Sequence, residues 1–150
     1  MRIAITADHN GVAMKAAMTR WLRAEGHQVT DHGVHDDEVV DYPALCERVC
    51  RDVQTGAAER GVVVGGTGGG EAIACNKLAG IRAGLCLTPV LAEISSGNNA
   101  SNVLVVGSKV LDDAAAVEIL QVWLATPFKG GVHRRRIDQI AALERGETLL

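Results

Sequence analysis

The sequence predicts an α/β fold in which helices pack on a parallel β-sheet. Segments with strand character alternate with segments of helical periodicity, and short connections join them, which is typical of parallel sheets. Hydrophobic residues make up 47% of the 150 residues and aromatic residues 3%, so the core must be built from Val, Ile, Leu and Ala. This amino-acid composition is typical of a parallel sheet that helices cover on both faces. The length predicts one domain, residues 1–150.

The first half of the chain alternates between strands and helices. Gly26 follows a segment with apolar side chains at helical spacing and is suited to end a helix. Val29 marks a second, weaker strand, and an acidic loop follows it. Pro43 is suited to the first turn of the next helix. The expected elements are strands at 2–7, around 29 and at 61–64, and helices at 12–25 and 43–53.

The second half continues the same alternation. Thr88 is expected to cap a helix whose first turn holds Pro89. Asp112 or Asp113 is expected to start another. Residues 97–102 are rich in Gly, Asn and Ser, which predicts a loop. The expected elements are helices at 71–78, 88–96, 112–124 and 133–145, and strands at 81–87 and 103–106.

A glycine-rich loop follows the third expected strand and is the most distinctive feature of the chain. Residues 65–70 contain five glycines and Thr67, and Glu71 follows at the start of a helix. Such a loop presents backbone N–H groups to an anion, and glycines let a ligand approach the backbone. A loop that only holds phosphate would seldom end in a carboxylate. Glu71 is therefore either a complement to the helix dipole or a catalytic group.

Polar residues also follow the other expected strands, where ligands of parallel sheets bind. Asp8-His9 forms either a helix-capping turn or part of a site. Arg134-Arg135-Arg136 forms either a solvated helix face or, with His133, a phosphate-binding group. Asn98 and Asn99 most often serve a turn.

Charge and composition exclude several classes of protein. The net charge of −3 gives no reason to expect nucleic-acid binding. No apolar run reaches the roughly 18 residues of a membrane span, and a strand begins at once, so we expect no signal peptide. The four cysteines lack metal-ligand spacing and the histidines lack helical pairing, so we expect buried, reduced thiols in a cytoplasmic protein, with no metal and no cofactor.

Six motifs along nearly the whole chain carry a specific resemblance. They are Asp8-His9-x-Gly11, Asp41-Tyr42-Pro43, Gly66-Thr67-Gly68-x-Gly70, Ala74-x-Asn76-Lys77-x-x-Gly80-Ile81-Arg82, Asn99-x-x-Asn102-Val103-Leu104 and His133-x-x-Arg136. Together they resemble the type B ribose-5-phosphate isomerase family, which includes the galactose-6-phosphate isomerase subunits. The resemblance implies a Rossmann-like three-layer sandwich with a five-stranded parallel sheet. It also implies metal-independent interconversion of aldose and ketose phosphates through an enediolate, by dimers or dimers of dimers with shared active sites.

The resemblance implies a catalytic base at Glu71. Many family members have a cysteine where this chain has Gly65, and a second branch has a glutamate at the position of Glu71. A carboxylate can move one proton between adjacent carbons, and the loop N–H groups can hold the developing oxyanion. Thr67 and Asn99 are implied to act on the substrate carbonyl and hydroxyls.

The resemblance also implies a set of substrate-binding residues. They are Asp8, His9, Tyr42, Gly66, Gly68, Gly70, Asn98, Lys109 and Arg136. Lys109 stands where the family has arginine, so the charge is kept but the bidentate fork is lost. Val132 stands where the family has a second phosphate-contacting arginine. Arg134 or Arg135 could take over the role of that arginine. Asn98 stands where the family has its ring-opening histidine, and an amide is neither acid nor base near neutral pH.

Three functions are consistent with these departures. The first is an isomerase of the ribose 5-phosphate type, with ring opening left to water or another side chain. The second is an isomerase for an acyclic substrate such as a tetrose 4-phosphate. The third is a non-catalytic sugar-phosphate-binding subunit, which the retained Glu71, Thr67 and Asn99 argue against.

Overall fold

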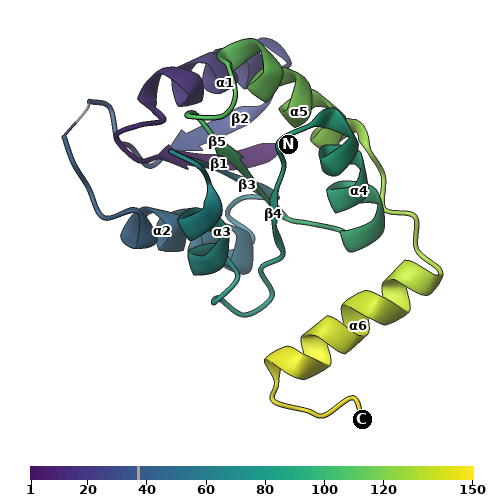
Figure 1. The fold of residues 1–150 in the computed structure, drawn as a ribbon. Coiled ribbons are helices and arrows are strands. Elements are labelled where there is room, and N and C mark those ends of the chain that lie inside the picture. The colour runs from purple at the N-terminus through teal and green to yellow at the C-terminus, as the bar shows by residue number, and fades with distance from the viewer. Residues whose placement is uncertain (37) are drawn as a thin grey trace.

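The computed structural model describes residues 1–36 and 38–150 and contains a five-stranded parallel sheet in the order β2-β1-β3-β5-β4 (Figure 1). The strands are β1 (Arg2–Ala7), β2 (Gln28–Asp31), β3 (Arg60–Gly65), β4 (Ala83–Leu85) and β5 (Val103–Gly107). From β1 the chain moves to the edge strand β2, and from β3 onward it builds the other half of the sheet. The strand order therefore reverses between β1 and β3, where parallel sheets bind ligands.

The register aligns the carboxyl ends of the three central strands. Ala7 of β1 lies opposite Val64 of β3, and Gly65 lies opposite Gly107 of β5. The segments that leave these strands consequently start at the same level, at one edge of the sheet.

Helices cover both faces of the sheet, which confirms the predicted three layers. The helices are α1 (Val12–Ala24), α2 (Tyr42–Thr55), α3 (Gly69–Cys75), α4 (Pro89–Asn99), α5 (Asp113–Ala125) and α6 (Val132–Glu144). Helices α1 and α5 lie on one face, α2 and α3 lie on the other, and α4 packs beside α5 (Figure 1). Helix α6 extends away from this body. No helix in the described part of the chain is long and apolar enough to cross a membrane.

Side-chain alternation along the strands divides the core into two clusters. Leu104 and Val106 face α1 and α5, whereas Val103 and Val105 face α2 and α3. This alternation is the pleat of a strand buried on both faces. Trp123 of α5 is the largest fully buried side chain.

Two helices differ from the sequence-based expectation because glycines lie inside them. Helix α3 begins at Gly69, two residues before the predicted start, and ends at Cys75. Helix α4 continues through Gly97 to Asn99, so the prediction of a loop at 97–102 was wrong for residues 97–99. A Cβ on Gly97 would lie 3.2 Å from side-chain atoms of Thr126 and Lys129. The absence of a side chain on Gly97 therefore lets these two residues pack closely against α4. Tertiary packing outweighs the low helix propensity of glycine here.

Candidate active site

Backbone hydrogen bonds join the loops that leave β1, β3 and β5. The N–H of Asp8 donates to Val64 O at 3.0 Å, and the N–H groups of Ser108 and Lys109 donate to Gly65 O and Gly66 O at 2.9 and 2.8 Å. These bonds bring the Asp8-His9 turn, the glycine loop and Lys109 together, as the sequence predicted for the carboxyl edge of the sheet.

Asp8 is buried at the end of β1, and both oxygens of its carboxylate accept hydrogen bonds. Oδ1 accepts from the N–H groups of Asn10 and Gly11 at 2.9 and 3.2 Å, and Oδ2 accepts from the Asn10 side-chain amide at 3.0 Å. Asp8 therefore closes the turn before α1, but the helix-capping interpretation was wrong, because the N-cap is Gly11 and no side chain caps this helix. The same contacts hold the carboxylate in place within the site.

The glycine loop turns directly from β3 into α3. Gly68 caps the helix with φ of 80°, a left-handed conformation that favours glycine. The Thr67 hydroxyl accepts from the N–H of Gly69 at 3.3 Å, and the Thr67 side chain is exposed. A Cβ on Gly70 would collide with the hydroxyl and ring of Tyr42, so this ring lies against the loop from the start of α2.

Glu71 lies in the first turn of α3, and its side chain turns back toward β3. The residue is only 4% exposed. A Cβ built on Gly65 would collide with all three terminal atoms of the Glu71 side chain, Cδ, Oε1 and Oε2. The carboxylate therefore occupies the space beside β3 where other residues at position 65 would place a side chain.

Burial raises the pKa of Glu71 above the ordinary value of 4.5, because the charged form loses hydration. A hydrogen bond from its own backbone N–H lowers the pKa in part, and the nearby Asp8 carboxylate raises it again. A buried glutamate whose protonated form is favoured in this way is suited to accept and return a proton, as general acid–base chemistry requires.

His9 and Lys109 lie at the same edge as Asp8. The Lys109 side chain passes over Gly66, with Cδ and Cε 3.4 Å from the place of a Cβ there. His9 lies within 3.3 Å of the Asn10 amide through Nε2. An imidazole and an ammonium at one end of the glycine loop suit the phosphate of a substrate.

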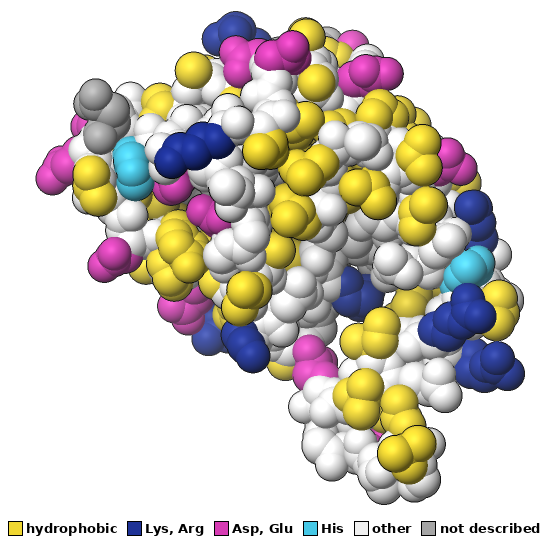
Figure 2. All heavy atoms as spheres, in the orientation of Figure 1, with side chains coloured by type: hydrophobic (Ala, Val, Ile, Leu, Met, Phe, Trp, Pro, Cys, Tyr) yellow, Lys and Arg dark blue, Asp and Glu magenta, His cyan; other side chains and the backbone are white. Residues whose placement is uncertain are grey.

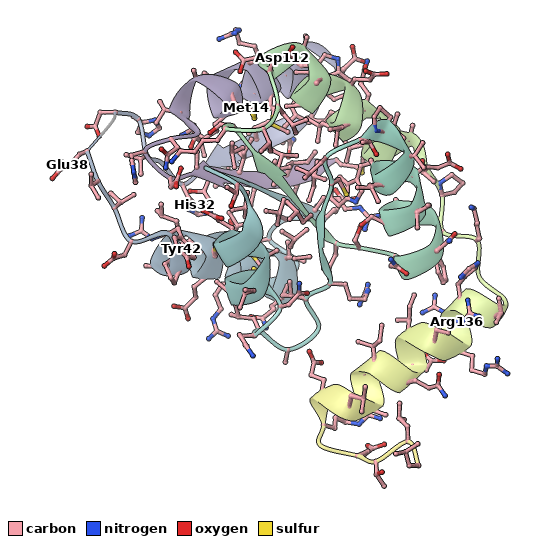
Figure 3. The ribbon with its side chains drawn as sticks, in the orientation of Figure 1. Met14, His32, Glu38, Tyr42, Asp112 and Arg136 are labelled. Carbon is pink, nitrogen blue, oxygen red and sulfur yellow. The ribbon has the colours of Figure 1, made fainter. Side chains whose placement is uncertain are left out.

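Asn98, Asn99 and Arg136 do not join this group within one chain. Asn98 and Asn99 end α4, and the next strand, β5, starts at Val103, so both lie toward the amino end of the sheet. Arg136 is exposed on α6, on the other side of the molecule from Tyr42 in this view (Figure 3). One chain thus holds two separate groups of the candidate residues.

A cavity of about 600 Å³ lies beside the second group. Asn99 lines it together with Arg82, Ser95, and Ile140 and Leu143 of α6. Figure 2 shows the recess between α6 and the rest of the molecule. Its lining does not include Glu71, so this cavity is separate from the glycine loop.

Sequence reasoning did not select Ser108 and Asn10, which support the first group. The Ser108 hydroxyl donates to Asn10 O at 2.9 Å and approaches Gly65 O at 3.1 Å, so it joins the loops after β1, β3 and β5. The position of Ser108 directly after a strand was the available signal. Within the described residues, no group of three or more His, Cys, Asp or Glu side chains is arranged to hold a metal ion.

The chain matches one protein family over most of its length. The profile of the Ribose/Galactose Isomerase family matches residues 3–140. The ribose-5-phosphate isomerase B of Escherichia coli K12 is 38% identical over 144 residues, which is 96% of this chain and 97% of that protein.

Solved structures agree with this match. The ribose-5-phosphate isomerase B of Clostridium thermocellum superimposes with a TM-score of 0.96 at 38% identity, over 97% of this chain and 99% of that one. The enzyme of Mycoplasma genitalium, solved with bound ribulose 5-phosphate, gives a TM-score of 0.92 at 31% identity, over 96% of each chain. With its parallel sheet and the Glu71 loop at the switch point, the chain belongs to the ribose/galactose isomerase family.

Proposed function

We propose that this chain is an aldose–ketose isomerase that acts on a sugar phosphate of the ribose 5-phosphate type through an enediolate, with Glu71 as its base. The observation that carries the proposal is the buried carboxylate of Glu71, held against Gly65 and close to Asp8, with a raised pKa. Sugar-phosphate isomerase activity is the activity of the named relatives, among them those of E. coli and Listeria innocua.

The reaction needs one base that returns the proton it removes. Glu71 takes the proton from the carbon beside the aldose carbonyl, the electron pair forms the carbon–carbon double bond, and the carbonyl oxygen becomes the oxyanion. Backbone N–H groups of the glycine loop stabilise that oxyanion. The proton of the neighbouring hydroxyl passes to this oxyanion, so the negative charge of the enediolate moves to the second oxygen. The protonated Glu71 then delivers its proton to the former carbonyl carbon, and the second oxygen becomes the ketose carbonyl. Thr67, Asp8 and Tyr42 orient the hydroxyl groups.

A second copy of the chain completes the site in this proposal. His9 and Lys109 hold the phosphate from one side, while Asn98, Asn99 and Arg136 come from the partner. The separation of the two groups within one chain supports this arrangement, as does the projection of α6 (Figure 1). Helix α4 also exposes Val90, Leu91 and Ile94, which suits a homodimer or a dimer of dimers.

Residues 1–150 act as a single isomerase domain in this proposal, and the protein is cytoplasmic. All four cysteines are free and buried, which is consistent with a reducing compartment.

Glu71→Gln tests the function because it keeps the shape of the side chain and removes its basic oxygen. Purified wild-type protein and the variant are assayed against a panel of aldose and ketose phosphates, with unphosphorylated sugars alongside. We expect kcat of the variant to fall by about 10²–10⁴. Glu118→Gln, on the exposed face of α5, is the matched control and keeps full activity. Near wild-type turnover by the Glu71 variant would show that another group is the base.

Asn98 favours a second candidate function, an isomerase for an acyclic tetrose 4-phosphate. An asparagine in a turn would need no further explanation, but Asn98 lies inside α4. Its side-chain oxygen is buried and lacks a hydrogen-bond partner within the described residues, so no hydrogen bond of this oxygen within one chain explains the asparagine. The same substrate panel separates the candidates, and binding without turnover of any member would instead indicate a non-catalytic subunit.

A further inference from the structure

Asn10 occupies the centre of the phosphate end of the site, although no motif includes it. Its side-chain Nδ2 lies 3.0 Å from Asp8 Oδ2 and 3.3 Å from His9 Nε2. The same nitrogen lies 3.4 Å from the place of a Cβ on Gly66, beside the Lys109 side chain. One amide thus contacts the carboxylate and the imidazole and lies beside the glycine loop.

The contact with Asp8 determines which way the Asn10 amide faces. A carboxylate oxygen accepts hydrogen bonds, so the group turned toward Asp8 must be the NH2 and not the carbonyl. The backbone of Asn10 is held as well, because its N–H donates to Asp8 Oδ1 at 2.9 Å and its carbonyl accepts from the Ser108 hydroxyl at 2.9 Å.

The fixed amide in turn determines the tautomer of His9. Its second N–H faces Nε2 of the imidazole, and a nitrogen that accepts a hydrogen bond cannot carry the hydrogen. The neutral ring therefore carries its hydrogen on Nδ1. Nδ1 is buried and has no hydrogen-bond partner among residues 1–36 and 38–150, so this N–H has no acceptor of its own in the described chain.

We propose that Asn10 is a positioning residue that holds His9 as the Nδ1–H tautomer and fixes its ring at the edge of the glycine loop, where the proposed phosphate site lies. The role in phosphate binding rests on the proposed function, whereas the tautomer rests on the contacts of Asn10 alone. Without the amide, the ring of His9 loses the contact that fixes it and can exchange tautomers and rotate. Loss of the amide is then expected to lower the affinity for phosphate more than it lowers kcat.

Nitrogen-15 NMR of the histidine ring tests the tautomer, because it reports which nitrogen carries hydrogen and requires no turnover. The chain has five histidines, and His9→Gln identifies the His9 signals by their loss. We expect Nδ1–H in the wild-type protein. Asn10→Ala removes the donor to Nε2 and leaves no second carboxylate beside Asp8, so the ring should then no longer be held as the Nδ1–H tautomer alone. A wild-type ring with its hydrogen on Nε2 alone would overturn the proposal.

Binding measurements give the second readout. Asn10→Ala should raise the Kd of inorganic phosphate and the KM of the sugar phosphate by about tenfold, the loss of one hydrogen bond to a site group, while kcat changes less. Gln121→Ala, on the exposed side of α5, is the control. An Asn10→Ala protein with unchanged tautomer and unchanged phosphate affinity would refute the role. A wild-type protein that isomerises nothing would refute the proposed function but leave the tautomer result standing.

Discussion

The carboxylate of Glu71 fills the space that a side chain on Gly65 would need. The terminal atoms of Glu71 are the nearest neighbours of a Cβ built at that position, and all of them are too close for both groups to coexist. The family resemblance concerns the same two positions, because many members have a cysteine at position 65. In this chain, a side chain at position 65 and the observed position of Glu71 exclude one another.

Gly65→Ala should therefore inactivate the enzyme without unfolding it. Gly65 does not have the positive φ that favours glycine, so alanine fits its backbone, but the new methyl group displaces the Glu71 carboxylate. We expect kcat to fall by about 10²–10⁴, as for loss of the base. In a double-mutant cycle, Gly65→Ala should add little to Glu71→Gln, because both remove one function. Independent, multiplying effects would contradict the coupling.

The raised pKa of Glu71 predicts two pH dependences. The base must be ionised, so kcat/KM should fall on acidification with an apparent pKa above the ordinary 4.5 of glutamate. For stability, the native state holds this proton more tightly than the unfolded chain. The contribution of Glu71 to the free energy of unfolding therefore decreases as pH rises from the unfolded to the native pKa. Glu71→Gln should consequently be more stable than wild type at neutral pH, as measured by urea unfolding.

Equal stability of the Gln variant and wild type at every pH would contradict this explanation. The comparison at pH well below 4.5 is the internal control, because Glu71 is then protonated in both states and the two proteins should differ least.

Local patterns predicted most of the fold. Each expected strand and helix exists, and the central strands β1, β3 and β5 carry the β-branched residues of a sheet buried on both faces. The structure differs from the sequence-based prediction where contacts between residues far apart in the chain determine the conformation. The segment 126–129 packs against Gly97, and the N–H of Lys129 donates to Gly97 O at 2.8 Å. These contacts are made to the end of α4, where the sequence favours a turn, and no local pattern could contain them.

The sequence also predicted which segments form the candidate site, but not how their side chains are placed. Strand ends in a parallel sheet meet at one edge, so Asp8, the glycine loop and Lys109 could be grouped from the sequence. The position of the Glu71 side chain against Gly65 depends on a rotamer, and the Asn10 contacts depend on a turn. Both follow from three-dimensional packing and could not be predicted from spacing.

Mixed oligomers test whether two chains share each site. Glu71→Gln and Arg136→Ala alter different groups, which the proposal assigns to different chains of one site. Each variant alone should be poorly active at substrate concentrations well below KM. When the two are co-expressed with different tags, about half of the dimers are mixed and each contains one intact site, so about a quarter of the activity should return.

The control mixes each variant with itself after the same purification. Activity of the mixed sample equal to the average of the separate variants, with exchange of subunits demonstrated by the tags, would show that Arg136 does not complete a partner's site.

The position of Asn98 inside α4 leads to the last prediction, which concerns the substrate. Pentose phosphates rest largely as closed rings, so their isomerase gains from a group that moves the ring proton, and an amide cannot do this. A tetrose with phosphate on its terminal hydroxyl cannot close a five-membered ring, because the required oxygen is blocked. The acyclic candidate therefore predicts a higher kcat/KM for a tetrose 4-phosphate than for ribose 5-phosphate, and the ribose 5-phosphate type of isomerase predicts the reverse.

Asn98→His separates ring opening from the later proton transfer. A histidine can exchange the ring proton, so the variant should turn over ribose 5-phosphate faster, while turnover of the tetrose, which has no ring to open, should change little. Asn98→Gln keeps the amide and should give no gain with either sugar. A clear preference of the wild-type protein for ribose 5-phosphate would instead mean that water or another side chain opens the ring, and that Asn98 is compatible with an ordinary pentose-phosphate isomerase.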